Sequence, residues 1–149
     1  MIIIGIDPDS KEHGVSVYVD GKLNDLKNLS LIGVMELLTS EEFNNIDMSF
    51  IQAHIEDVCA NNATFSKSFI KNQAAFRKVT NSVGRCQQAQ VELERMLSHL
   101  GVKVVKHKIS SAWKKDKKQF ELVTGWKGKS NEDTRSAAYF GYLGVTYKP

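Results

Sequence analysis

Acidic residues stand at the ends of predicted elements in three separate parts of the sequence. Asp7 follows a β-branched run, Glu56 follows an alternating segment, and Glu132 and Asp133 open the last predicted helix. Carboxylates that lie close together repel one another, so such a cluster is stable mainly when it is protonated or holds a divalent cation. Mg²⁺ favours a few carboxylates together with substrate phosphate, and two such ions about 3.5 to 4 Å apart can hydrolyse a phosphodiester. These residue types therefore indicate metal-dependent phosphodiester hydrolysis, provided that the fold brings them together.

Each of these acids also has a purely structural interpretation. Asp and Pro are common in turns, so Asp7–Ser10 could serve only to turn the chain after the first strand. Ser130 and Asp133 have the spacing of a capping box, in which Asp133 would cap the last helix. A catalytic role therefore depends on the elements that position the acids.

The first residues predict a buried strand and then a hairpin. The continuous β-branched run Ile2–Ile6 is typical of a strand that is buried on both faces. Alternating valines over Val15–Val19 are separated by Asp20-Gly21 from a further run, Lys22–Leu29. This pattern predicts a hairpin with a type I′ turn.

The remaining sequence predicts helices that alternate with strands. The expected elements are a helix that Ser30 caps and Asn44-Asn45 closes, a strand ending at Glu56, a helix over Val83–Leu100, a strand over Val102–His107 and a helix over Asn131–Leu143. Asn61–Ser82 lacks clean periodicity and is typical of a mobile loop or a frayed helix. The order predicts one α/β domain over residues 1–149, with a mixed sheet. If the strands that end in Asp7 and Glu56 are parallel neighbours, the two acids meet at one edge of the sheet.

Length and composition exclude several classes of protein. The 149 residues suffice for one sizeable core but not for a two-lobed enzyme, and 42% hydrophobic with 25% charged residues is typical of a folded domain. No apolar run approaches the roughly 20 residues of a membrane span, and Gly5 and Asp7 interrupt the apolar start, unlike a signal peptide. We therefore expect a soluble cytoplasmic protein. Cys59 and Cys86 lack the spacing of a disulfide framework or a zinc site.

Charge is distributed unevenly along the chain. Residues 1–65 hold three lysines against eleven acids, a net charge of −8, whereas residues 66–149 hold seventeen Lys and Arg against six acids, a net charge of +11. This asymmetry indicates a surface that binds a polyanion such as nucleic acid. The alternative is that these lysines are only the solvated faces of helices.

Several motifs together resemble the RuvC family of Holliday junction resolvases, and the short chain is similar to the phage-encoded branch. The matching segments are Ile4–Ser10 continuing to Gly14-Val15, His54–Val58, Ser82–Gln87 at the start of a helix, and Ala137-Ala138 in an acidic last helix. The resemblance implies an RNase H-like α/β fold, with a mixed five-stranded sheet of antiparallel hairpin strands and parallel strands flanked by helices. It also implies a homodimer that nicks branched DNA with two Mg²⁺ per site, for which Mn²⁺ could substitute.

The same resemblance implies roles for individual residues. Asp7, Glu56, Asp133 and Glu132 would be the metal ligands, and Lys115 or Lys118 would stabilise the charge that develops on the phosphate. The residues expected to contact DNA are Phe65, Lys67, Phe69, Lys71, Arg77, Lys78, Arg85, Lys114, Lys115, Lys117 and Lys118. The helix over Val83–Leu100 is the expected dimer face. The expected substrates are four-way junctions, flaps and replication forks, in the host cytoplasm if the protein is phage-encoded.

The sequence departs from the family pattern at three places. Asp9 stands where the family has glycine, Cys59 stands where familiar members have an aromatic residue, and Ser130 and Ser136 flank Asp133 at the spacing of a second helix ligand. These departures keep two alternatives open, namely a catalytically silent protein that binds branched DNA and an RNase H-like nuclease that acts on RNA or hybrids. A sugar-kinase-like ATPase would need a second lobe, so we expect no nucleotide cofactor.

Overall fold

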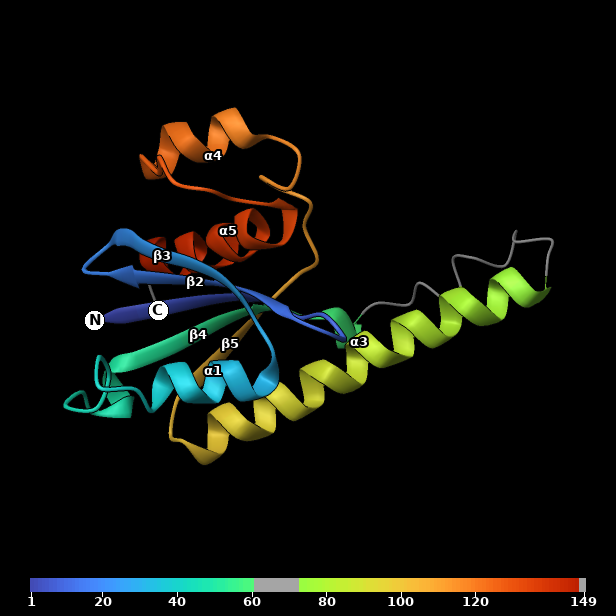
Figure 1. Ribbon diagram of the computed structural model, residues 1–149, viewed down its shortest axis with the longest axis horizontal. Helices are drawn as coiled ribbons and strands as arrows, with labels where there is room; N and C mark the ends of the chain where they lie inside the picture. The colour runs from blue at the N-terminus through green and yellow to red at the C-terminus, as the bar shows by residue number, and fades with distance from the viewer. Residues whose placement is uncertain (61–72, 148–149) are drawn as a thin grey trace.

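The computed structural model describes residues 1–60 and 73–147, and its centre is a five-stranded sheet in the order β3-β2-β1-β4-β5 (Figure 1). The strands are β1 (Ile2–Asp7), β2 (His13–Val19), β3 (Lys22–Leu29), β4 (Ile51–Glu56) and β5 (Lys103–His107). β1 pairs antiparallel with β2 and parallel with β4, and β4 pairs parallel with β5. The predicted mixed sheet, with its antiparallel hairpin and parallel strands, is confirmed.

Helices cover both faces of the sheet. They are α1 (Leu31–Leu38), α3 (Gln73–His99), α4 (Lys117–Thr124) and α5 (Glu132–Thr146), together with the 3₁₀ turns η1 (Met48–Phe50) and η2 (Val58–Ala60). Figure 1 shows α1 and α3 on one side of the sheet, α5 on the other, and α4 outside α5. None of the helices in residues 1–60 and 73–147 combines the length and the apolar character needed to cross a membrane.

The alternation of side chains along β1 explains both layers of the fold. Ile4 and Ile6 are fully buried in the main apolar core, which also contains Leu93 and Leu97 of α3. Gly5 points to the opposite face, where a Cβ atom would overlap the carbonyl oxygen of Ala137 in α5. The absence of a side chain therefore lets α5 lie directly on the backbone of β1.

The hairpin between β2 and β3 turns as predicted. Asp20 has φ 49° and Gly21 has φ 81°, so both turn residues lie in the left-handed region that a type I′ turn requires. Asp and Gly tolerate this region better than most residues, which explains why the short sequence signal is reliable here.

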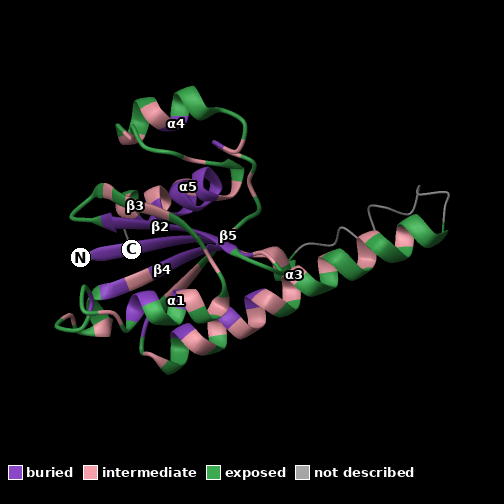
Figure 2. Ribbon diagram, in the orientation of Figure 1, coloured by how far each residue is buried: buried purple, intermediate pink, exposed green. Residues whose placement is uncertain are grey.

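Three predicted boundaries are wrong. α1 ends at Leu38 rather than at Asn44-Asn45, because Thr39 already caps it. The alternation of side chains predicts a strand that begins at Met48, but Met48–Phe50 forms a 3₁₀ turn and β4 begins only at Ile51. α3 begins at Gln73 rather than at Val83, so the helical alternative for Asn61–Ser82 holds from Gln73 onward, whereas residues 61–72 lie outside the described residues. This part of the helix lacks clean periodicity because it projects from the body and is mostly exposed (Figure 2).

Candidate active site

Two of the predicted acids end neighbouring parallel strands. The register of β1 against β4 runs to Ile6 opposite Ile55, so Asp7 and Glu56 follow as adjacent strand ends. Both are buried, with 6% and 4% of their surfaces exposed. The backbone N–H of Ser110 donates a hydrogen bond of 3.3 Å to Oε1 of Glu56 and fixes one side of that carboxyl group. Asp7 and Glu56 therefore lie side by side at the carboxyl edge of the sheet, as the sequence predicted.

Burial and mutual repulsion govern the charge of this pair. Burial and, after it, the nearby Asp7 carboxylate together raise the pKa of Glu56 to about 7. Oδ2 of Asp7 is buried and accepts no hydrogen bond within the described part of the chain. Its nearest cation is Lys114 Nζ, 3.5 Å away. A buried, incompletely satisfied carboxylate pair is an arrangement that a bound cation would stabilise.

Lys114 is the lysine that the structure brings to the acids. Desolvation by itself would lower the pKa of Lys114, but the charges of Asp7 and Glu56 outweigh it and raise the pKa above its usual value. The neighbouring Lys115 and Lys118 are exposed, and neither is among the described residues that line the cavity beside the acids. Which member of a lysine run faces a site depends on the loop conformation, so the sequence alone could not single out Lys114.

A clamp from α5 determines that loop conformation. Arg135, which is 9% exposed, donates through Nε to the carbonyl oxygen of Trp113 at 3.1 Å and through Nη2 to that of Lys114 at 2.6 Å. Its Nη1 donates to Ser130 Oγ at 3.1 Å. Trp113 has φ 66°, a strained conformation for a bulky residue, and it packs against Phe120, Tyr139 and Tyr142. The clamp directs Lys114 toward Asp7, and its residues gave no recognisable signal in the sequence.

Asp133 reaches the same edge from the first turn of α5. The predicted capping box of Ser130 and Asp133 is wrong, because Asn131 caps the helix and exchanges hydrogen bonds with Thr134. The pairs Ser130/Asp133 and Asn131/Thr134 both have the spacing of a capping box and differ by one position, so the sequence pattern was ambiguous. As a result the carboxylate of Asp133 does not serve as the cap. Partial burial, then Asp7 and Asp9, raise its pKa.

A glycine allows this approach. Gly14 pairs with Asp7 across the β1–β2 ladder, and a Cβ atom there would overlap the backbone carbonyl of Asp133. The start of α5 therefore rests on bare backbone of β2, and this contact sets how closely Asp133 can approach Asp7.

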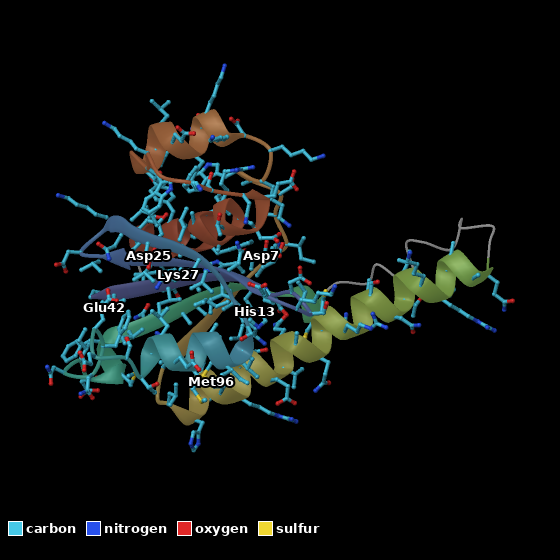
Figure 3. All side chains as sticks on the ribbon, in the orientation of Figure 1. Asp7, His13, Asp25, Lys27, Glu42 and Met96 are labelled. Atoms are coloured by element: carbon cyan, nitrogen blue, oxygen red, sulfur yellow. The ribbon has the colours of Figure 1, made fainter. Side chains whose placement is uncertain are left out.

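The acids and Lys114 surround one open cavity of about 300 Å³ at the end of the sheet, where Figure 3 labels Asp7 and His13. The lining residues are Asp7, Pro8, Asp9, Glu56, Val58, Ser82, Val83, Cys86, Lys114 and Asp133. Glu132 is exposed and does not belong to this lining. The carboxylate oxygens are the donors that Mg²⁺ prefers, so the residues present fit a hard divalent cation. Among residues 1–60 and 73–147, no three Asp, Glu, His or Cys side chains already stand at the spacing of a metal site.

The predicted DNA contacts are only partly described. Phe65, Lys67, Phe69 and Lys71 lie outside the described residues. Arg77, Lys78 and Arg85 are exposed on α3, and Lys117 is exposed on α4, where its Nζ lies 3.7 Å from Glu121. Lys11 was not predicted, yet it lines a groove with Arg85 beside the acidic cavity. A single lysine in a turn carries no sequence signal for such a position.

The predicted dimer helix is partly used within the chain. Leu93 and Leu97 are fully buried against the sheet, and Gln90 is buried as well. Gln90 donates to Asp57 Oδ1 at 3.0 Å and accepts from the N–H of Cys59 at 3.0 Å. This face of α3 therefore supports the segment after Glu56 and packs within the chain rather than against a second molecule.

Comparisons with known proteins identify the fold. No protein-family model matches the sequence, and neither does any curated protein. The structure is similar to RuvC of T. thermophilus in complex with a Holliday junction substrate, with a TM-score of 0.59 and 15% identity over 97% of this chain and 93% of that one. A second structure of Thermus thermophilus RuvC gives a TM-score of 0.57 and 15% identity, covering 97% of this chain and 94% of that one. The chain therefore has the RuvC-like, RNase H-like α/β fold that the sequence predicted.

Proposed function

We propose that this protein is a metal-dependent endonuclease that nicks branched DNA. The observation that carries the proposal is the burial of Asp7 and Glu56 side by side on a cavity that Asp133 and Lys114 also line. The similar RuvC structure, which was determined with a Holliday junction substrate, supports branched DNA as the substrate class. We extend the proposal to flaps and replication forks, and to a relation with the compact phage-encoded resolvases.

Asp7 and Glu56 would hold divalent cations, Mg²⁺ or Mn²⁺, together with Asp133 from α5 and with Glu132 as a nearby further donor. When bound, two such ions supply the activation of water and the neutralisation of the leaving oxygen. Ser110 orients the Glu56 carboxyl through its hydrogen bond. The cavity is open to solvent, and Ser82, Val83 and Cys86 of α3 line it together with the acids.

Lys114 would stabilise the negative charge that develops on the phosphate. Its ammonium lies 3.5 Å from Asp7, and Arg135 holds the backbone carbonyl of Lys114, so the side chain would be oriented before substrate binds. Lys115 and Lys118, which were expected in this role, are exposed and better suited to more distant phosphates. We propose them, with Lys117, as part of the DNA-binding surface.

Affinity for DNA would come chiefly from phosphate contacts. Arg77, Lys78 and Arg85 are exposed along α3, and Lys11 lies beside Arg85 at the edge of the acidic cavity. Such contacts predict binding that weakens steeply with salt and shows little sequence preference. A homodimer formed through exposed residues of α3 would present two sites to a junction with two-fold symmetry. The proposed location is the cytoplasm, or the host cytoplasm for a phage protein.

The test is cleavage of four-way junction, flap, linear duplex and RNA–DNA hybrid substrates in parallel, each with Mg²⁺ and with EDTA. We expect nicking of the branched substrates only with metal. Asp7→Asn should still bind the junction but should lose nicking, whereas Asp25→Asn, which removes an acid of β3 that pairs with Lys27, should cut normally. Full activity of Asp7→Asn would overturn the ligand assignment, and preferred cleavage of the hybrid would indicate the RNA-directed alternative.

A catalytically silent branched-DNA-binding protein is the second candidate. It is favoured by Ser136, one helical turn after Asp133, whose fully buried hydroxyl has no hydrogen-bond partner within the described residues. The resemblance implied an acidic ligand at this spacing, and serine cannot replace its charge. Tight junction binding with no product in either Mg²⁺ or Mn²⁺ would establish this function instead.

A further inference from the structure

We infer that Asp9, in the turn after β1, is a further carboxylate ligand of the cation site and supplies the negative charge that α5 lacks at Ser136. This inference rests on the proposed function, because it concerns the same cation site. It follows from the position of Asp9, from the contacts that orient its side chain, and from the incomplete satisfaction of Asp7.

Asp9 belongs to the same cavity as the three acids already described. It lines the 300 Å³ space with Asp7, Glu56 and Asp133, although it comes from a different segment, the loop between β1 and β2. It is partly buried, unlike its exposed neighbours Ser10 and Lys11.

Hydrogen bonds hold one oxygen of Asp9 and leave the other available. Oδ1 accepts from the N–H and hydroxyl of Ser10 and, at 3.8 Å, from the thiol of Cys86 on α3. The backbone N–H of Asp9 donates to Nδ1 of His13 at 3.1 Å, and His13 is 2% exposed. Within residues 1–60 and 73–147, Oδ2 makes no hydrogen bond or ion pair. Metal-binding carboxylates are commonly oriented in this way by outer hydrogen bonds.

The acids that line the cavity lack sufficient positive charge and hydrogen-bond donors around them in the described part of the chain. Asp7 is more than nine-tenths buried, and within the described residues its Oδ2 accepts no hydrogen bond and has only Lys114, at 3.5 Å, to balance its charge. Four carboxylates around one lysine leave an excess of negative charge, which oxygen-binding divalent cations would neutralise. Three acids from separate elements and a fourth from the β1–β2 turn would complete the set without an acid at Ser136.

The test measures binding of Mn²⁺ by isothermal titration calorimetry and by electron paramagnetic resonance of the free ion. The variants are Asp9→Asn and Asp9→Ala, with Asp7→Asn as the reference for a lost ligand. Glu12→Gln is the matched control, because it removes the same charge from the same loop at an exposed position outside the cavity lining. Circular dichroism establishes that each variant is folded, which is expected because Asp9 lies in a partly exposed turn.

Loss of an outer-shell partner commonly weakens metal binding by about 10- to 100-fold, so loss of a ligand should weaken it by at least about 10-fold. We expect this loss in both Asp9 variants and a change of less than about 2-fold in Glu12→Gln, since exposed charges are strongly screened. Wild-type affinity in the Asp9 variants, with weakened binding in Asp7→Asn, would overturn the inference and leave the nuclease proposal intact. Equal losses in Asp9→Asn and Glu12→Gln would reduce the role of Asp9 to a general charge effect. Failure of the wild-type protein to bind Mn²⁺ would instead refute the proposed function.

Discussion

Replacement of Glu56 by glutamine is expected to stabilise the metal-free protein above neutral pH. Glu56 is 4% exposed, and burial together with Asp7 raises its pKa from 4.5 to about 7 in the folded protein. Between these two pH values the folded protein binds more protons than the unfolded chain, so the free energy of unfolding falls as the pH rises. One pKa unit corresponds to about 1.4 kcal/mol, so the ionised carboxylate costs about 3 kcal/mol at pH 8.

Glutamine has the shape of glutamate but carries no charge, and it can still accept the hydrogen bond from Ser110. Glu56→Gln should therefore raise the free energy of unfolding by about 2 to 3 kcal/mol at pH 8, or roughly 4 to 12 °C in Tm, and change it little near pH 4.5. The measurement is thermal and urea unfolding in EDTA at both pH values. Mg²⁺ should raise the Tm of the wild-type protein at pH 8 much more than that of the variant.

Glu121→Gln is the control, because Glu121 is 42% exposed and forms only a surface ion pair with Lys117, which should contribute less than about 1 kcal/mol. A Glu56→Gln protein that is less stable than the wild type at pH 8 would refute the account of a repelling buried pair. So would a gain of the same size at both pH values, because it would show that charge is not the cause.

Three further predictions concern the elements around the site. Gly14→Ala should destabilise the protein by about 1 to 3 kcal/mol and reduce nicking more than junction binding, since a Cβ atom would push Asp133 away. Unfolding and cleavage assays on one preparation test this, and unchanged cleavage would contradict it. Arg135→Met should lower kcat with little change in KM, because Lys114 loses its orientation; full kcat would show that the clamp is dispensable. Burial, followed by the charges of His107 and Lys103, lowers the pKa of His54 to about 4. Protonation of His54 should therefore oppose folding as the pH falls from about 6.5 toward 4, against the gain that Glu56 contributes over the same range. His54→Asn should gain stability relative to the wild type as the pH falls through this window, and a difference in free energy of unfolding that does not change with pH would refute this.

The elements whose signals are local could be predicted from the sequence. Ile2–Ile6 is apolar at every position because helices cover both faces of β1. Asp20 and Gly21 are residue types that adopt the left-handed backbone conformation of a type I′ turn, so this turn is evident from the sequence. The meeting of Asp7 and Glu56 was predictable because parallel strands place their carboxyl ends at one edge.

The features that depend on distant contacts could not be predicted. The choice of Lys114 over its neighbours depends on Arg135, which lies on a later helix and was not recognised as a functional residue. The N-terminal part of α3 has no buried stripe, so its helical periodicity is absent from the pattern of apolar residues. The role of Gly14 follows from the approach of α5, which no local signal specifies.

The projecting part of α3 has a thermodynamic consequence. Every buried residue of this helix is at or beyond Gln90, so, within the described residues, the preceding turns contribute no fully buried side chain to the core (Figure 2). Most helical stability in proteins comes from tertiary packing, so these turns should open at a low free energy while the sheet stays closed. A ligand that lies along them would have to suppress this fraying, and part of its favourable enthalpy would be offset by the lost conformational entropy. The amide hydrogens of α3 should therefore exchange slowly from Gln90 onward and faster in the preceding, projecting turns.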